Sequence, residues 1–236
     1  MIVWELIESV KVPISGETLS LRRWGKEYSI DVDGSLLMNS YTHASEDALA
    51  EIACKRVSGV RQPSVLIGGL GMGYTLAAAL SRLGPQAKVE VAELLPAVVA
   101  WNRGVLGPLA GRPLADKRVS VFEGDVATLL RSQRAAYDAI LQDVDNGPEG
   151  LTMKGNDWLY SEEGLAAAAA ALRPEGVMAL WAAKPDKRFV KRMRRGGFNV
   201  DEVPVRGRDG QRGAHHIVWV AYLGPSRDFR RGRKRH

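Results

Sequence analysis

The residues best suited to chemistry are a run of glycines and several carboxylates, each of which follows a short apolar stretch. The glycines alternate through residues 68–73 (GGLGMG), at Gly69, Gly71 and Gly73. Glycine at such a place permits a tight turn with positive φ and lets the backbone approach a ligand closely. Glu93 ends KVEVAE, where a carboxylate can accept two hydrogen bonds from ribose hydroxyls. Asp125 ends RVSVFEGD, where a carboxylate can accept one hydrogen bond from the amine of adenine.

The order of these groups along the chain indicates what they bind together. Three successive strand ends bring a glycine-rich loop, Glu93 and Asp125 to one sheet edge, which suits an adenosine-containing ligand lying across that edge. The alternative is that both carboxylates are loop residues that cap the helices following them. Tyr74 and Thr75 stand where a dinucleotide fold has its closing glycine or alanine, which favours S-adenosylmethionine over a dinucleotide. No G-K-[ST] sequence follows the glycines, which excludes a P-loop.

A further strand end supplies the best candidate for a catalytic cluster. Asp143 ends the run YDAILQD, and Asp145 and Asn146 follow it directly. We predict Asp143 and Asp145 as catalytic residues; the alternative for both is an Asp–Asn turn that closes the loop or caps a helix. One cysteine and four histidines provide no pattern with metal-ligand spacing, so we predict no metal site.

The elements that must position these residues follow from apolar periodicity. The first forty residues are rich in β-branched and aromatic side chains, and Asp33-Gly34 predicts a tight hairpin turn. A helix is expected to start after Ser45, its predicted N-cap. From Val65 onward, short apolar runs alternate with helical stretches, which predicts a mostly parallel sheet covered on both faces. The last two strands, FNVDEVPV and HHIVWVAYLG, are joined by a short link and are expected to pair antiparallel.

The chain from Val65 to Trp181 resembles the spermidine synthase family within the class I S-adenosylmethionine-dependent methyltransferase fold. The resemblance rests on the runs VLIGGLGMGYTLAAAL, VEVAELLPAVVAWNR, RVSVFEGDVATLL, YDAILQDVDNGP and LYSEEGLAAAAAALRPEGVMAL. It implies an α/β, Rossmann-like sheet, mostly parallel with an antiparallel C-terminal strand, preceded by a small β-rich segment. It also implies a transferase that acts on a small-molecule acceptor and forms a homodimer.

Carried over by position, the resemblance assigns roles to the same residues. The three glycines fall in the nucleoside-binding loop, Glu93 would hold the ribose hydroxyls and Asp125 the adenine. Asp143 falls where the family has its catalytic aspartate, which helps to deprotonate the attacking amine and lies beside the donor sulfonium. The donor would be S-adenosylmethionine or its decarboxylated form.

The chain departs from the family at the residues that hold polyamines. The family's G-G-G-D-G-G run has an aspartate for the cationic amino end of decarboxylated S-adenosylmethionine, and Met72 stands in that slot. The family's Tyr-His-Glu run corresponds here to Ala50-Glu51-Ile52, and its D-x-x-D-P element becomes DVDNGP at residues 143–148. We therefore expect transfer of a methyl or related group, with aminopropyl transfer and a non-catalytic nucleoside- or RNA-binding protein as the alternatives.

Charge is distributed unevenly over the chain, whose net charge is +6. Residues 184–195 contain seven basic residues and one Asp, and residues 227–236 contain six basic residues and one Asp, so the remainder is net acidic. Both basic segments are candidates for a weak nucleic-acid contact. We divide the chain into a β-rich segment (1–44), an S-adenosylmethionine-binding domain (45–224) and a disordered basic tail (225–236).

The composition limits which classes of protein this chain can belong to. Hydrophobic residues make up 45% of the chain and charged residues 25%, which is typical of a globular protein and excludes a fibrous or disordered one. A lone Cys54 cannot form an internal disulfide bond. The start of the chain lacks a signal-peptide core, because Glu5 and Glu8 interrupt it, and the uncharged run at 62–81 has glycines in its middle. These features predict a cytoplasmic protein that has no contact with a membrane.

Overall fold

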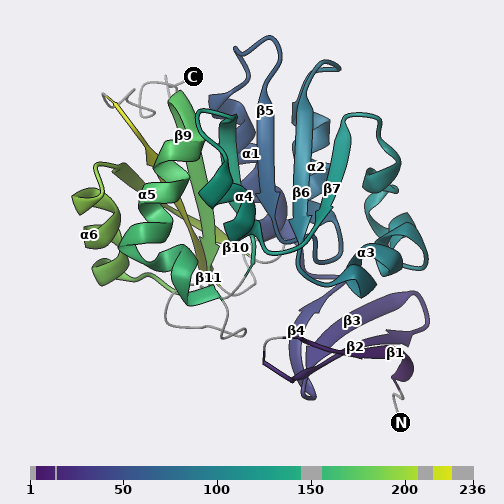
Figure 1. Ribbon diagram of the computed structural model, residues 1–236. Coiled ribbons are helices and arrows are strands. Elements are labelled where there is room, and N and C mark those ends of the chain that lie inside the picture. Colours follow the sequence, from purple (N-terminus) through teal and green to yellow (C-terminus); the bar gives the residue numbers. More distant parts are fainter. Residues whose placement is uncertain (1–3, 14, 145–155, 207–214, 225–236) are drawn as a thin grey trace, which may run out of the picture.

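The computed structural model describes residues 4–13, 15–144, 156–206 and 215–224. The first four strands form an antiparallel sheet in the order of the sequence: β1 (Glu5–Lys11), β2 (Thr18–Trp24), β3 (Glu27–Val32) and β4 (Ser35–Asn39). Asp33 and Gly34, between β3 and β4, both have positive φ, as the sharp two-residue hairpin requires. This N-terminal sheet lies against one end of the remaining molecule (Figure 1).

The larger sheet has the order β10-β11-β9-β8-β5-β6-β7 within the described residues. Its strands are β5 (Ser64–Gly68), β6 (Lys88–Glu93), β7 (Val119–Glu123), β8 (Tyr137–Gln142), β9 (Leu172–Ala182), β10 (Asn199–Arg206) and β11 (His215–Tyr222). Strands β5 to β9 are parallel, whereas β11 pairs antiparallel with both β9 and β10. The apolar runs form these central strands because both of their faces are covered.

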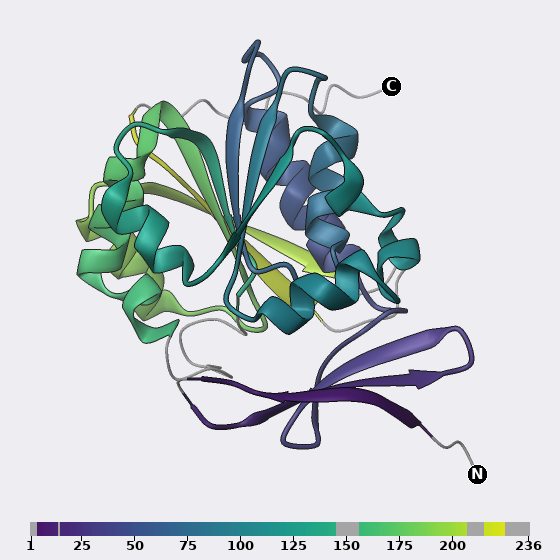
Figure 2. The same ribbon diagram turned by 45° about the vertical axis from the view of Figure 1, so that its right-hand side comes forward.

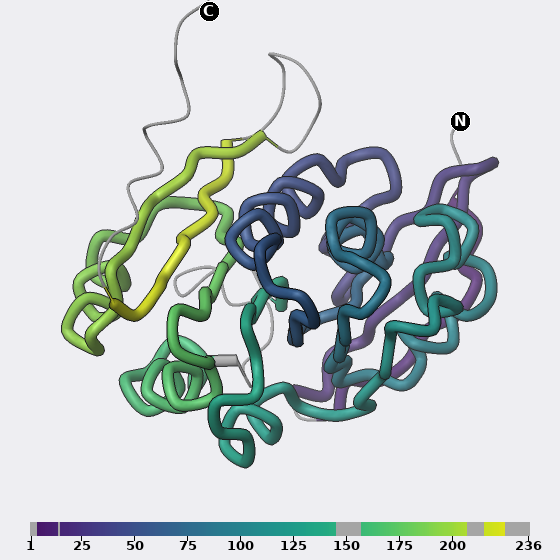
Figure 3. Tube along the Cα trace, turned by 90° about the horizontal axis from the view of Figure 1, so that it is seen from above, coloured from purple at the N-terminus to yellow at the C-terminus, as the bar shows by residue number. Residues whose placement is uncertain are grey.

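Helices cover the two faces of the larger sheet (Figure 2). The face that carries the larger apolar cluster packs on α1 (Ala44–Arg56), α2 (Tyr74–Arg82) and α3 (Pro96–Arg103). The other face packs on α4 (Val126–Ser132), α5 (Glu162–Ala171) and α6 (Lys187–Arg195). Short 3₁₀ turns complete the fold: η1 (Gly107–Ala110), η2 (Pro113–Ala115) and η3 (Asn156–Tyr160). Viewed from above, β10 and β11 extend the sheet on the side away from β7 (Figure 3).

The connection between strands reverses direction at the centre of the sheet. From β5 the chain proceeds outward through β6 and β7, then returns to place β8 on the other side of β5. In open α/β sheets, ligands bind in the crevice at the carboxyl ends of the two strands that flank such a reversal. The loops that follow β5 and β8 carry Gly69 and Asp143, so this topology determines where a ligand site is expected.

The predicted fold class is confirmed, including the antiparallel C-terminal pair and the small N-terminal sheet. The prediction of Ser45 as the N-cap of α1 is wrong. Helix α1 starts at Ala44 with His43 as its N-cap, and the Ser45 hydroxyl donates to the Glu46 carboxylate at 2.6 Å rather than capping backbone N–H groups. The domain boundaries stay a prediction. Asp145 and the tail 225–236 lie outside the described residues.

Candidate active site

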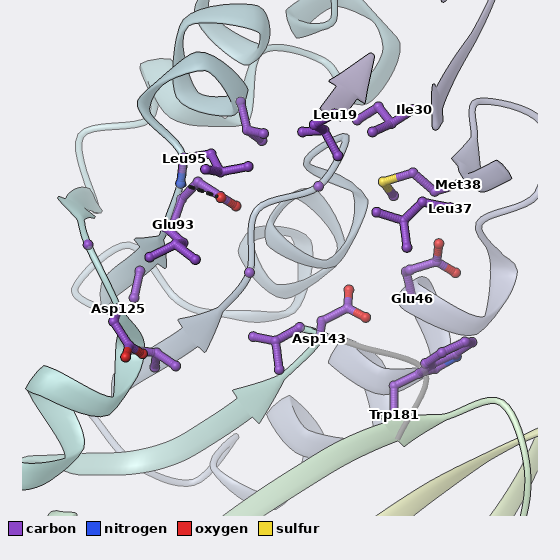
Figure 4. A pocket seen from close by; sticks show the side chains of 18 residues that line it. Leu19, Ile30, Leu37, Met38, Glu46, Glu93, Leu95, Asp125, Asp143 and Trp181 are labelled. Atoms are coloured by element: carbon purple, nitrogen blue, oxygen red, sulfur yellow. Dashed lines mark hydrogen bonds between the residues drawn. The ribbon is translucent and has the colours of Figure 1, made fainter. Parts of the chain in front are cut away.

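A cavity lies between the N-terminal sheet and the carboxyl edge of the larger sheet (Figure 4). Its lining combines residues of both sheets and of the helix that joins them. The lining side chains include those of Leu37, Met38, Glu46, Glu93, Asp125, Asp143 and Trp181. Carboxylates from four different elements or strand ends therefore meet in one space, surrounded by apolar side chains.

The glycine loop between β5 and α2 forms one wall of the cavity. Gly69, Gly71 and Gly73 all have positive φ, and the first two line the cavity directly. A Cβ atom on Gly69 would overlap the backbone carbonyl oxygen of Asp143, because the ends of β5 and β8 approach closely there. The side-chain amide of Asn102 on α3 donates to the Gly71 carbonyl at 2.8 Å and helps to hold the loop. Asn102 was not among the residues predicted from the sequence.

Glu93 is buried at the end of β6 and holds the loops on both sides of it. One carboxylate oxygen accepts the backbone N–H of Leu70 and the other that of Leu95, both at 2.9 Å. Burial raises the pKa of Glu93, while these backbone N–H groups oppose that shift by stabilising the charged form. The backbone N–H groups of Gly71 and Leu94 also stabilise the carboxylate, and the side chain lines the cavity. The geometry therefore supports two roles for Glu93, one in the loop and one toward a ligand.

Asp125 likewise combines a structural role with a place in the cavity. It is the N-cap of α4, and its Oδ1 accepts the backbone N–H of Ala127 at 2.8 Å. The capping role considered in the sequence analysis is thus observed. The same side chain lines the cavity on the side of Glu93 (Figure 4), where its second oxygen can accept a hydrogen bond from a ligand.

Asp143 lies in the middle of the cavity, directly after β8 (Figure 4). Its backbone N–H donates to the Gly68 carbonyl at 2.9 Å, and its Oδ2 accepts the hydroxyl of Thr75 at 2.6 Å. Burial raises the pKa of Asp143, and the Thr75 hydroxyl opposes this by stabilising the carboxylate. A positioned carboxylate with a raised pKa is suited to accept a proton from an attacking group.

Glu46, in the first turn of α1, is a second carboxylate in this part of the cavity that sequence reasoning missed. Burial and the nearby charge of Asp143 raise the pKa of Glu46 to about 7. Figure 4 shows both side chains directed into the same space. An acidic residue in the first turn of a helix is ordinarily explained by the helix dipole. The sequence therefore contained no signal that separated Glu46 from its neighbour Asp47.

The wall beyond these two carboxylates is apolar. Leu37 and Met38 of β4 contribute to it from the N-terminal sheet, and Trp181 of β9 contributes from the larger sheet. Met72, in the slot where the resembled family has an aspartate, is fully buried in the apolar cluster below the loop. A methionine side chain carries no charge, and Met72 does not line the cavity.

The N-terminal sheet is fixed against the larger domain by contacts near the cavity. The indole Nε1 of Trp101 on α3 donates to Glu8 of β1 at 2.6 Å. The Tyr74 hydroxyl at the start of α2 donates to the carbonyl of Ser40 at 3.0 Å. These bonds fix the N-terminal sheet, and with it the part of the cavity wall that β4 contributes, relative to the glycine loop.

The chain is similar in sequence to known proteins of one family. Residues 46–192 match the family model for the spermine/spermidine synthase domain. Polyamine aminopropyltransferases of Mycobacterium tuberculosis and Mycobacterium bovis are 32% identical over 146 residues, which cover 58% of this chain and 27% of theirs. The matched region is thus about a quarter of the length of these curated relatives.

Solved structures share the fold at lower sequence identity. Spermidine synthase from Thermotoga maritima has a TM-score of 0.73 and 19% identity, and the match covers 93% of this chain and 73% of that one. A spermidine synthase in complex with the transition-state analogue AdoDATO has a TM-score of 0.71 with the same identity and coverage. A probable spermidine synthase from Corynebacterium glutamicum has a TM-score of 0.62 at 16% identity, covering 93% of this chain and 80% of that one.

The mostly parallel sheet, its antiparallel terminal pair and the ligand cavity at the reversal point define a class I S-adenosylmethionine-dependent methyltransferase-like fold. Within this class, the chain belongs to the spermine/spermidine synthase domain family.

Two features are absent from the residues that the structure describes. No helix there is long and apolar enough to cross a bilayer. No group of three or more His, Cys, Asp or Glu side chains there is arranged to hold a metal ion.

Proposed function

We propose that this chain is an aminopropyltransferase, which binds decarboxylated S-adenosylmethionine and transfers its aminopropyl group to the nitrogen of a small amine. The observation that carries the proposal is the pair of carboxylates, Glu46 and Asp143, in one cavity with the glycine loop and Glu93. The first two suit a cationic amine, and the last two suit an adenosine. The family to which the chain belongs supports the same reaction.

The reaction needs few dedicated groups, because the sulfonium already activates the carbon that is transferred. The amine lone pair forms a new C–N bond, the C–S bond breaks, and its electron pair stays on sulfur as the neutral thioether 5′-methylthioadenosine. Before this attack, the amine must release the proton that it carries as an ammonium. Asp143 is the residue placed to accept it, and Thr75 holds the carboxylate in orientation. Alignment of the amine with the sulfonium is the main contribution of the protein.

Methyl transfer from S-adenosylmethionine is the second candidate, and one observation favours it. Met72 is fully buried where an aspartate would hold the amino end of the decarboxylated donor. S-adenosylmethionine carries its own carboxylate beside that amino group and has less need of one from the protein. The two reactions leave different thioethers, so the product separates them.

The test is to incubate the protein with each donor and a mixture of primary amines, and to identify the thioether released by liquid chromatography. We expect 5′-methylthioadenosine from the decarboxylated donor. Release of S-adenosylhomocysteine alone would replace the proposal with methyl transfer. Failure of calorimetry to detect binding of either donor would contradict both reactions.

Glu93→Gln provides a matched test of the nucleoside half. The amide can accept only one of the two backbone N–H groups, so we expect donor affinity to fall at least about tenfold. Glu202→Gln, an exposed change on β10, is the control and should leave affinity unchanged. Equal affinities for the two variants would remove Glu93 from the site.

A further inference from the structure

The two halves of the cavity differ in the groups they offer. On the side of Glu93 and Asp125, two carboxylates lie among apolar side chains such as those of Leu95 and Val126, which suits the flat apolar faces and polar edges of an adenosine. On the other side, Glu46 and Asp143 are adjacent, and the surface beyond them consists of apolar side chains. This second half is where an acceptor must lie, because the reacting end of the donor points toward Asp143 in the proposed reaction.

Glu46 and Asp143, the two carboxylates on the acceptor side, can balance only a limited number of positive charges on the bound ligands. Burial raises the pKa of both carboxyl groups, and the charge of Asp143 raises the pKa of Glu46 further, so the pair is suited to bind cationic groups that keep both carboxylates ionised. The decarboxylated donor brings an ammonium of its own, and Met72 leaves that group without the family's aspartate. Two carboxylates therefore serve the donor ammonium and one amino group of the acceptor.

A second ammonium on the acceptor has no carboxylate to meet within the described part of the cavity. It would lie against Leu37, Met38 and Trp181. Placing an ammonium there is costly, because it loses its water and meets no carboxylate of the described residues. The cation–π contact that the Trp181 ring offers compensates only part of that loss. An alkyl or aryl group at the same place would instead gain from contact with these apolar side chains.

We infer that the acceptor of this cavity is a primary amine with one cationic end and an apolar body, rather than a diamine. The inference rests on the proposed function, since it concerns the acceptor of that same reaction. The apolar wall selects against the diamine by desolvation, and Glu46 and Asp143 hold the amino group that reacts. The preference arises because a diamine would leave its second ammonium unpaired, and not because the protein adds an attractive contact to the preferred amine.

The decisive experiment compares two acceptors of nearly equal size, n-pentylamine and 1,4-diaminobutane, with whichever donor supports turnover. The measured quantity is kcat/KM from the release of the thioether. We expect n-pentylamine to be preferred by about tenfold or more. Equal or better use of 1,4-diaminobutane would overturn the inference and leave the proposed function standing. Failure of donor binding or of thioether release with both amines would contradict the proposed function, and the inference with it.

A pair of variants on β4 tests the wall itself. Leu37→Glu places a carboxylate on the apolar surface, so we expect relative use of 1,4-diaminobutane to rise about tenfold. Leu36→Glu is the matched control, because Leu36 is the adjacent residue and is 57% exposed. An unchanged amine preference in a folded Leu37→Glu protein would contradict the role of this wall. The comparison in the unaltered protein remains decisive if that variant does not fold.

Discussion

The carboxylate of Glu46 makes the stability of the molecule depend on pH near neutrality. Burial and the charge of Asp143 raise the pKa of Glu46 from 4.5 to about 7. Below pH 4.5 the side chain is protonated in both the folded and the unfolded chain. Between pH 4.5 and about 7, the folded chain binds more protons at Glu46 than the unfolded chain does. The stabilisation present at low pH is therefore lost as the pH rises through about 7.

We therefore expect Glu46→Gln to be more stable than the unaltered protein at pH 8, and close to it at pH 4. The difference in the free energy of unfolding should be on the order of 1–3 kcal/mol at pH 8. Urea denaturation at both pH values measures it. Glu51→Gln, on the same helix but in an exposed ion pair with Arg82, is the control and should change stability by less than about 1 kcal/mol. A Glu46→Gln effect of equal size at both pH values would contradict the raised pKa.

At the scale of elements, the loop between β5 and α2 depends on close approach as well as on backbone conformation. Gly34 and Gly69 both have positive φ, but a Cβ on Gly34 meets nothing within 4 Å, whereas one on Gly69 overlaps the backbone after β8. Substitutions at the two positions therefore separate the energetic cost of a side chain at positive φ from the cost of its steric overlap with neighbouring atoms.

Gly34→Ala should reduce the free energy of unfolding by about 1 kcal/mol, the cost of a side chain in the left-handed region. Gly69→Ala should cost about 3 kcal/mol or more, and should also abolish donor binding because β5 and β8 must separate. Thermal unfolding and calorimetry measure the two effects. Similar losses of stability for the two variants, with donor binding retained, would show that the loop tolerates a side chain.

On the scale of the whole molecule, basic side chains are concentrated on α6, which has six of them among its nine residues. Helix α6 buries Phe189, Val190 and Met193 against the sheet, as its periodicity predicts. Lys187, Lys191 and Arg195 are exposed and have no acidic partner among the described residues. Contact with a nucleic acid through this surface stays a prediction, as does the homodimer.

Reversing two of these charges tests that contact. The double variant Lys187→Glu/Lys191→Glu should elute from immobilised RNA at lower salt than the unaltered protein, because fewer phosphates are neutralised. The double variant Lys26→Glu/Lys88→Glu changes net charge equally at exposed sites elsewhere and is the control. Equal shifts in elution for both variants would attribute retention to net charge alone.

The sequence by itself determined the sheet and one half of the site. Periodicity and glycine spacing identified the strands, and parallel strands bring their carboxyl ends to one edge, so Gly69, Glu93, Asp125 and Asp143 were expected together. Each of these residues ends a strand or lies within two residues of its end, and local pattern was therefore sufficient. The same local reasoning misplaced the start of α1 by choosing Ser45 over His43 as the N-cap.

Only the tertiary structure decided which residues surround Asp143 in the acceptor half. Glu46 comes from the first turn of α1, Leu37 and Met38 from a separate sheet, and Trp181 from a distant strand. Their meeting depends on how the N-terminal sheet is docked, through contacts such as that between Trp101 and Glu8. No local pattern encodes contacts between segments so far apart in the chain, because burial and packing select them only when the whole chain has folded.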